Sequence, residues 1–196
     1  FAHEVRNPIH NISTGLQVME RALPEDDAQR EDIHRLLMDL DRVSNLMNSM
    51  LSTTRTSDMK PRPVELGRLI KSQVDRLKPS ITREGISCLI NIEPDLPQIS
   101  GDTRALEQIF NNLILNAVDA SPKGSKIQVI ALPYDKAPDH VAIKVVDYGH
   151  GIPRHVLSSI FDPFFTTKAK GHGTGLGLSV SQGIVTKHGG KIVVSS

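Results

Sequence analysis

The chain has 196 residues, of which 38% are hydrophobic and 23% are charged, and its formal net charge is +1. These fractions are typical of a soluble globular protein, and the small net charge does not favour binding to nucleic acid or to a membrane surface. The single cysteine, Cys88, excludes an internal disulfide and fits a reducing compartment.

No apolar run approaches the roughly 20 residues that a membrane-spanning helix needs. No signal peptide is visible at the start of the sequence either. We therefore expect this segment to be cytoplasmic. Because Phe1 is not an initiator methionine, the sequence reads as a piece of a longer protein, and any membrane attachment would come through upstream segments.

The first 60 residues contain one glycine, Gly15, and predict two helices joined by a short loop. Apolar side chains recur every three or four residues, first at Ile9, Ile12, Leu16, Met19 and Leu23, then at Ile33, Leu37, Leu40, Val43 and Met50. Pro24 ends the first helix, and the acids after it favour the start of the second. An antiparallel hairpin cannot cover both apolar stripes alone, so we expect a homodimeric four-helix bundle. Burial against the following domain is the alternative.

The polar, proline-bearing segment TTRTSDMKPRP (53–63) predicts a linker between domains 1–58 and 62–196. After it we expect helices at 66–77, 103–120, 156–160 and 178–188, and strands at 86–92, 127–132, 141–146 and 191–196. Asp102 or Thr103 would cap the second of these helices, and 133–139 would form a turn. Strands mostly in hairpin order with inserted helices predict an α+β fold: a sandwich with helices on one face of a mixed sheet.

A glycine-rich cluster, GHGTGLG (171–177), precedes the last predicted helix. Glycines let the backbone approach phosphate closely, and a helix N-terminus offers free N–H groups. The cluster is neither a Walker loop nor a dinucleotide fingerprint, because no Gly-Lys-Ser/Thr follows and no βαβ unit surrounds it. Alone it would more often be a flexible loop.

A second motif, DYGHGIP (147–153), directly follows the apolar strand at 141–146. An acid there, next to glycines, can point a carboxylate into a pocket walled by bare backbone. The carboxylate of Asp147 would accept a hydrogen bond from the amine of adenine and repel the carbonyl of guanine. An ordinary Asp-x-Gly turn is the alternative.

A third motif, NNLILNAVDA (111–120), lies in the strongest predicted helix. Asn112, Asn116 and Asp119 are spaced by four and three, so they project from one face. Such a face can offer oxygen to Mg²⁺ and donors to phosphate. A solvated helix face is the alternative for this motif alone.

Together these motifs resemble the ATP site shared by histidine kinases, type II DNA topoisomerases, heat-shock chaperones and mismatch-repair ATPases. The run FDPFFTTK (161–168) is specific to the histidine kinases within that group. The resemblance implies that Asn116 is the Mg²⁺ ligand, Asn112 a phosphate contact and Asp147 the adenine reader. It further implies nucleotide contacts or a mobile lid at Gly149, Gly151, Ile152, Phe165, Lys168, Gly173, Thr174, Gly175, Leu176 and Gly177.

The start of the chain, FAHEVRNP (1–8), resembles the phosphoacceptor box of the commonest histidine kinase class. A neutral imidazole is a competent nucleophile near pH 7, which suits His3 to accept a phosphoryl group. The resemblance gives Glu4 the role of taking the ring proton, and Asn7 the role of orienting water in regulator dephosphorylation. A zinc site is disfavoured, because Asn7 stands where a zinc-protease helix needs histidine.

The resemblance implies an ATP-dependent autokinase that phosphorylates His3 and passes the phosphoryl group to an aspartate of a response regulator, with phosphatase activity on that regulator. Asn112 stands where hydrolytic relatives carry a glutamate, and an amide cannot act as a general base, which favours transfer over hydrolysis. A silent dimeric scaffold and an ATP-hydrolysing conformational switch are the alternatives.

Overall fold

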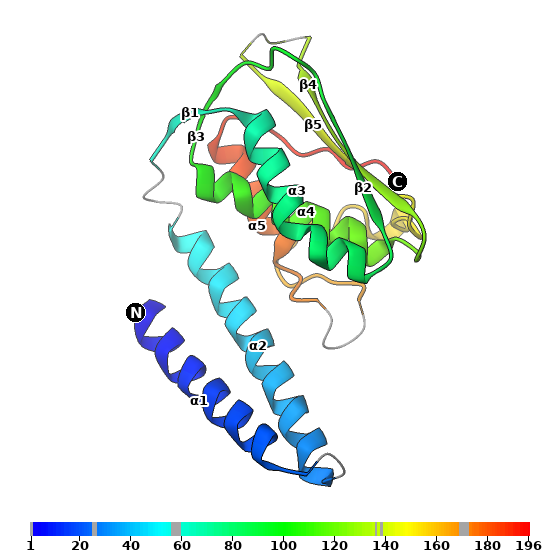
Figure 1. Ribbon diagram of the computed structural model, residues 1–196. Coiled ribbons are helices and arrows are strands. Elements are labelled where there is room, and N and C mark those ends of the chain that lie inside the picture. Colours follow the sequence, from blue (N-terminus) through cyan, green and yellow to red (C-terminus); the bar gives the residue numbers. More distant parts are fainter. Residues whose placement is uncertain (1, 25–26, 56–59, 136, 138, 169–172) are drawn as a thin grey trace. The chain divides into compact units, whose positions relative to one another are not determined.

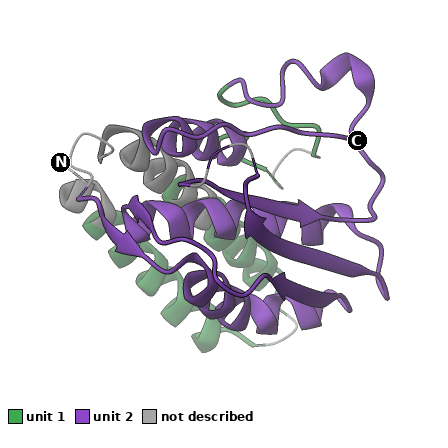
Figure 2. Ribbon diagram, turned by 90° about the horizontal axis from the view of Figure 1, so that it is seen from above, with its two compact units in different colours: residues 1–55, 163–176 green, residues 56–162, 177–196 purple. Residues whose placement is uncertain are grey.

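The computed structural model describes residues 2–24, 27–55, 60–135, 137, 139–168 and 173–196. The chain forms two compact units, one of Phe1–Arg55 with Pro163–Leu176 and one of Thr56–Asp162 with Gly177–Ser196 (Figure 2). Within the described residues, no helix is long and apolar enough to cross a membrane.

The first unit contains the predicted helical hairpin, α1 (Ala2–Ala22) and α2 (Ala28–Arg55), as Figure 1 shows. None of the hairpin's described side chains is a buried hydrophobic, and on its predicted apolar stripes Ile12 is 52% exposed, Met19 59% and Val43 49%. The hairpin alone therefore leaves its apolar stripes partly open to solvent. Helix α2 extends to Arg55, so the linker predicted from residue 53 was wrong in its first three residues, and residues 56–59 lie outside the description.

The second unit is built on a three-stranded sheet of β2 (Ser87–Ile92), β4 (Lys126–Pro133) and β5 (Val141–Val146), in the order β2-β4-β5. The hairpin of β4 and β5 confirms the prediction, with Val129 opposite Val145. Strands β2 and β4 are parallel, however, because the helix between them carries the chain back across the sheet. The sheet is therefore mixed, as expected, but contains one hairpin only.

Three helices of the second unit bury their apolar faces in one core: α3 (Leu66–Arg83), α4 (Thr103–Ala120) and α5 (Gly177–Lys187). Ile70, Phe110, Ile114 and Ile184 are each at most 2% exposed. Alternate residues of β4 complete this core, since Ile127, Val129 and Ala131 are fully buried while the residues between them are not. The result confirms the predicted α+β fold, with helices packed on a mixed sheet.

Helix α4 begins where the sequence predicted, with Asp102 as its cap. The Asp102 carboxylate accepts hydrogen bonds from the backbone N–H groups of Ala105 at 3.0 Å and of Lys60 at 3.2 Å. Partial burial raises the pKa of Asp102, but backbone N–H donors and the nearby His188 lower it by more, so the net shift is downward. The backbone N–H of Asp102 also donates to Nε2 of His188 at 3.0 Å, which ties the start of α4 to the end of α5.

Three details of the sequence prediction were wrong. The short strands β1 (Arg62–Val64) and β3 (Ile99–Gly101) were missed, because three residues are too few to show a period. The helix expected at 156–160 is a 3₁₀-helix at Arg154–Val156 followed by turns. The strand expected at 191–196 is absent, because alternating residues favour extended backbone but do not supply a neighbouring strand to pair with.

Candidate functional site

The segment after β5 contains the carboxylate of Asp147 and, two residues later, a glycine whose backbone lies very close to the end of α4. Asp147 is exposed, and one of its carboxylate oxygens accepts the backbone N–H of Gly149 at 3.0 Å. A Cβ on Gly149 would lie 2.2 Å from the carbonyl oxygen of Ala120, the last residue of α4. Only glycine therefore lets this segment pass the end of α4, and Gly151, with φ of 71°, continues the turn in a conformation that also favours glycine.

We expect Gly149→Ala to weaken nucleotide binding, because the added methyl group must push the segment away from the end of α4. The displacement would move the Asp147 carboxylate, which is held by the Gly149 N–H. Titration with a fluorescent ATP analogue should show at least about a tenfold weaker affinity.

Gly183→Ala is the matched control for this variant. Gly183 lies inside α5, and a Cβ added there meets nothing within 4 Å. Alanine at an exposed helix position stabilises by up to about 1 kcal/mol, so this variant should bind nucleotide normally and unfold at slightly higher temperature. Normal binding by Gly149→Ala would show that the close approach to Ala120 does not position Asp147.

The polar face of α4 lies opposite its buried face. Phe110, Ile114 and Val118 point into the core, whereas Asn112 and Asn116 are only half-buried. The side-chain nitrogen Nδ2 of Asn112 donates to the carbonyl oxygen of Gly177 at 3.0 Å and to Oγ of Ser181 at 3.2 Å. The fold thus brings together Asn112 and Gly177, two predicted site residues 65 positions apart in the sequence.

Most of the glycine-rich loop belongs to the first unit, and hydrogen bonds within that segment hold its described residues together. The backbone N–H of Phe164 donates to the carbonyl oxygen of Gly175 at 2.9 Å. Gly175 has φ of 65°, and a Cβ there would lie 2.3 Å from the Phe164 carbonyl carbon, so this crossing of two backbone segments requires glycine. Thr174 accepts the backbone N–H of Leu176 at 3.4 Å through its hydroxyl oxygen.

The other predicted loop residues also lie in this segment. The backbone N–H of Lys168 donates to the hydroxyl of Thr166 at 3.2 Å, and a Cβ on Gly173 would lie 2.7 Å from that hydroxyl oxygen. Phe165 is half-buried. Gly171 and His172, which the sequence placed in the same glycine cluster, lie outside the described residues.

The predicted acceptor residues lie on α1. The backbone of His3 and Glu4 is helical, and their side chains lie outside the description. Asn7 follows one helical turn later with an exposed side chain, and Pro8 lies inside the helix as expected. The acceptor residues and the residues of α4 therefore occupy different compact units.

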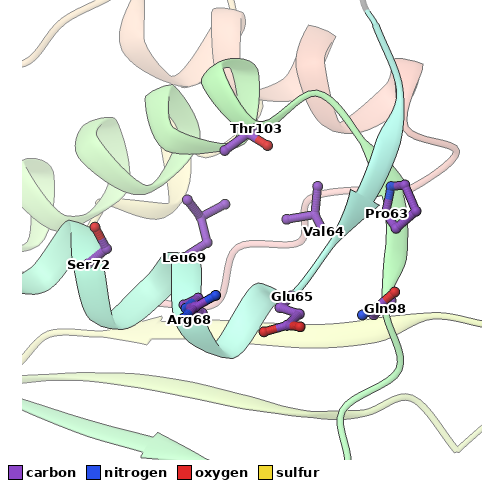
Figure 3. Close-up of a pocket in the computed structure, with 8 residues that line it drawn as sticks. All are labelled: Pro63, Val64, Glu65, Arg68, Leu69, Ser72, Gln98 and Thr103. Carbon is purple, nitrogen blue, oxygen red and sulfur yellow. The ribbon is translucent and has the colours of Figure 1, made fainter.

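The second unit also contains a hollow of about 390 Å³ (Figure 3). Its lining comes from the end of β1, the first turns of α3, the residue before β3 and the start of α4, with the residues Pro63, Val64, Glu65, Arg68, Leu69, Ser72, Gln98 and Thr103. None of the residues predicted as functional lines this hollow. Its geometry therefore gives no support to a nucleotide site there.

Sequence reasoning missed Ser181, whose side chain is fully buried and contacts Asn112. A signal was present in the sequence. Ser181 lies between Gly177 and Ile184 at helical spacing of four and three, so it falls on the face that packs inward. A hydroxyl on a buried helix face needs a hydrogen-bond partner, which could have directed attention to this position.

The polar groups of the second unit are of the kinds that can bind a nucleotide together with Mg²⁺. The exposed Asp147 carboxylate accepts from neutral N–H donors such as an adenine amine, as it does from Gly149. The amide oxygen of Asn116 is a ligand type that Mg²⁺ accepts. Gly149 and Gly151 lie in the segment that directly follows Asp147. The residues present therefore fit an adenine nucleotide with its metal ion.

Family models match both ends of the chain. Residues 1–58 match the His Kinase A (phospho-acceptor) domain. Residues 101–196 match the histidine kinase-, DNA gyrase B-, and HSP90-like ATPases. The two matches fall on the predicted acceptor hairpin and on the predicted nucleotide motifs.

A curated relative spans the whole chain. The signal transduction histidine-protein kinase AtoS of Escherichia coli (strain K12) is 32% identical over 195 residues, which cover 100% of this chain and 31% of AtoS. The chain spans less than half the length of the curated relatives that it matches first, between 31% and 44%.

Two solved structures resemble most of the chain. Full-length ShkA in complex with AMPPNP has a TM-score of 0.75 and 25% identity, over 96% of this chain and 40% of ShkA. The histidine kinase ThkA in complex with the response regulator protein TrrA has a TM-score of 0.70 and 25% identity, over 97% of this chain and 54% of that one.

Proposed function

Because this chain belongs to the sensor histidine kinases of two-component systems, we propose that it transfers the γ-phosphoryl group of ATP to its own His3. The observation that carries this proposal is the presence of both parts in one chain. A phosphoacceptor domain match covers residues 1–58, and an ATPase domain match covers residues 101–196. We propose domain boundaries of 1–58 and 62–196.

The nucleotide is bound by the second domain. ShkA, which this chain resembles in fold, was solved with AMPPNP, an ATP analogue. Asp147 reads the adenine amine, and Gly149, Gly151 and Ile152 provide backbone beside the base. Phe165, Lys168, Gly173, Thr174, Gly175, Leu176 and Gly177 form the lid. The crossing of Phe164 and Gly175 supports this lid role, because it closes the loop on itself.

Asn116 is the residue that would hold Mg²⁺, through its amide oxygen. The ion, when bound, would neutralise charge on the phosphate oxygens. Asn112 lies one helical turn before Asn116 and anchors α4 to the start of α5. Positioning and charge stabilisation account for most of catalysis in phosphoryl transfer, so these residues need no covalent role.

The acceptor chemistry belongs to α1. The unprotonated ring nitrogen of His3 forms a bond to the γ-phosphorus, and the bond from that phosphorus to the β–γ bridging oxygen breaks. ADP leaves with the electron pair, and the proton on the other ring nitrogen passes to Glu4. Asn112 offers no general base to activate water, which favours transfer over hydrolysis.

The phosphoryl group then passes from His3 to an aspartate on a response regulator. Support comes from ThkA, which this chain resembles in fold and which was solved with the response regulator TrrA. Asn7 is exposed one helical turn after His3. It would orient the water molecule that removes the phosphoryl group from the regulator's aspartate.

The chain acts as a homodimer. Helices α1 and α2 leave Val18, Met19, Leu36 and Met38 more than half exposed, at 63%, 59%, 52% and 55%. Burying apolar area of this kind releases about 25 cal/mol per Å². A second hairpin that covers these side chains in a four-helix bundle would therefore stabilise both copies.

Incubation with ATP labelled in the γ-phosphate tests the proposal. We expect stable incorporation into the protein that is lost in acid and kept in alkali, as a phosphoramidate requires, with slow release of free phosphate. Steady-state ATP hydrolysis without labelled protein would contradict the kinase assignment and support a conformational switch. If the protein neither incorporates label nor binds nucleotide, the result would support a silent scaffold.

A further inference from the structure

The pairing of β4 with β5 ends one residue before Asp147. Its last pair joins Gln128 with Val146, which is also the last residue of β5. Asp147 and Tyr148 are both exposed, so core packing does not hold them either. The position of Asp147 therefore depends on how the next two residues, Tyr148 and Gly149, are held.

Tyr148 is held on the face of the sheet that points away from the helices, here called the outer face. On β4, Ile127 is fully buried, so Lys126 and Gln128 on either side of it lie on the outer face. Nε2 of Gln128 donates to the phenol oxygen of Tyr148 at 2.8 Å. Nζ of Lys126 lies 6.0 Å from the centre of the Tyr148 ring, at the limit of cation–π attraction.

The contact of Tyr148 with Gln128 is diagonal across the hairpin. The direct partner of Gln128 is Val146, two residues before Tyr148. Diagonal neighbours lie farther apart than direct partners but remain within reach of an aromatic side chain. The tyrosine side chain therefore extends the connection between the two strands past the point where their backbones stop pairing.

Gly149 is held on the helix side of the sheet. A Cβ on this residue would lie 2.2 Å from the carbonyl oxygen of Ala120, so its backbone packs directly on the end of α4. The Asp147 carboxylate accepts the N–H of Gly149 at 3.0 Å and therefore lies near this end of α4.

Two consecutive residues are thus anchored on opposite sides of the sheet, Tyr148 on the outer face and Gly149 against α4. The pair of anchors fixes the backbone that carries the Asp147 carboxylate. Without the outer anchor, the segment keeps only its covalent link to β5 and its contact with Ala120. A hydrogen bond to a base depends on direction, so a small displacement of the carboxylate weakens it.

We propose that Tyr148 is a positioning residue: its contacts with Gln128 and Lys126 on the outer face hold the Asp147 carboxylate in the direction that favours adenine over guanine. Tyr148 itself does not touch the nucleotide, because its side chain lies on the face away from the helices. This inference rests on the proposed function, since it concerns the base preference of the same nucleotide site.

The first experiment measures the affinities of Tyr148→Ala for ATP and for GTP by displacement of a fluorescent nucleotide. Because the hydrogen bond of one carboxylate to the adenine amine is at stake, we expect the preference for ATP to fall about fivefold. Most of the fall should come from weaker ATP binding, with GTP affinity changed less than about twofold.

Tyr148→Phe is a milder variant that keeps the ring and removes only the hydroxyl group that Gln128 contacts. The preference for ATP should fall about twofold. Gln128→Leu removes the same hydrogen bond from the other strand and should have the same effect. These two variants test the inference even if Tyr148→Ala does not fold.

Tyr134→Ala is the matched control. Tyr134 is the other tyrosine of the chain, is exposed, and directly follows β4 at the opposite end of the same hairpin. Its replacement should leave both affinities unchanged. If Tyr148 only stabilised the fold, Tyr148→Ala would weaken ATP and GTP binding equally. That result, or an unchanged preference for ATP, would overturn the inference.

A double variant tests whether Tyr148 acts through Asp147. In a protein that already carries Asp147→Asn, adding Tyr148→Ala should change the ATP affinity less than about twofold, because the group that it positions has been replaced. A further fivefold loss would show that the two residues act independently and would overturn the inference.

The wild type separates failure of this inference from failure of the proposed function. A wild type that binds no ATP overturns the proposed function, and the inference with it. A wild type that prefers ATP over GTP, beside a Tyr148→Ala variant with the same preference, overturns the inference alone.

Discussion

Replacing His3 by glutamine is expected to abolish incorporation of phosphate from γ-labelled ATP while ATP still binds. The lone pair of an amide nitrogen is delocalised into its carbonyl group, so glutamine cannot attack phosphorus as a neutral imidazole does. Asn112, Asn116 and Asp147 lie in the other compact unit, so the substitution leaves them intact. Labelling should fall by at least about a thousandfold, to background, since no alternative nucleophile replaces the ring.

His10→Gln is the matched control for this result. His10 lies in the same helix, seven residues after His3, and is exposed. If His3 is the acceptor, His10→Gln should be labelled as strongly as the wild type, and the label should be acid-labile in both. Labelling that survives in His3→Gln and disappears in His10→Gln would move the acceptor to His10.

Replacing Asp147 by asparagine is expected to weaken ATP binding by about 10- to 100-fold. One oxygen of the Asp147 carboxylate accepts the N–H of Gly149 at 3.0 Å, and the proposal assigns the other oxygen to the adenine amine. Asparagine has a single side-chain oxygen for these two donors. Its amide nitrogen would then face either the Gly149 N–H or the adenine amine, donor against donor.

Base preference gives this prediction a second readout. The wild type should bind ATP more tightly than GTP, because guanine carries a carbonyl oxygen where adenine carries its amine. In Asp147→Asn the preference should shrink or reverse, since the amide nitrogen can donate to that carbonyl. Displacement of a fluorescent nucleotide by ATP and by GTP measures both affinities.

Asp139→Asn is the matched control, because Asp139 is exposed and precedes β5. It should keep wild-type affinity and wild-type preference. Unchanged ATP affinity in Asp147→Asn would show that this residue does not read the base. Contacts to the phosphate groups would then have to account for nucleotide binding.

The amino-acid sequence alone determined the identity and most bounds of the long elements. Helix α4 was predicted at 103–120 with Asp102 or Thr103 as its cap, and the structure has these bounds with Asp102 as the cap, because the capping carboxylate and the apolar period are local properties. The hairpin of α1 and α2 and strands β4 and β5 followed in the same way. The candidate site residues were also named from the sequence, since motif spacing carries their chemistry, and their roles stay predictions.

The tertiary structure alone decided which distant segments meet. The parallel pairing of β2 with β4, the buried contact of Ser181 with Asn112, and the approach of Gly149 to Ala120 join residues far apart in the chain. No local period encodes such a contact, because it depends on how whole elements pack. Strands β1 and β3 became visible only as a pair, since three residues gain stability from their partner and not from their own sequence.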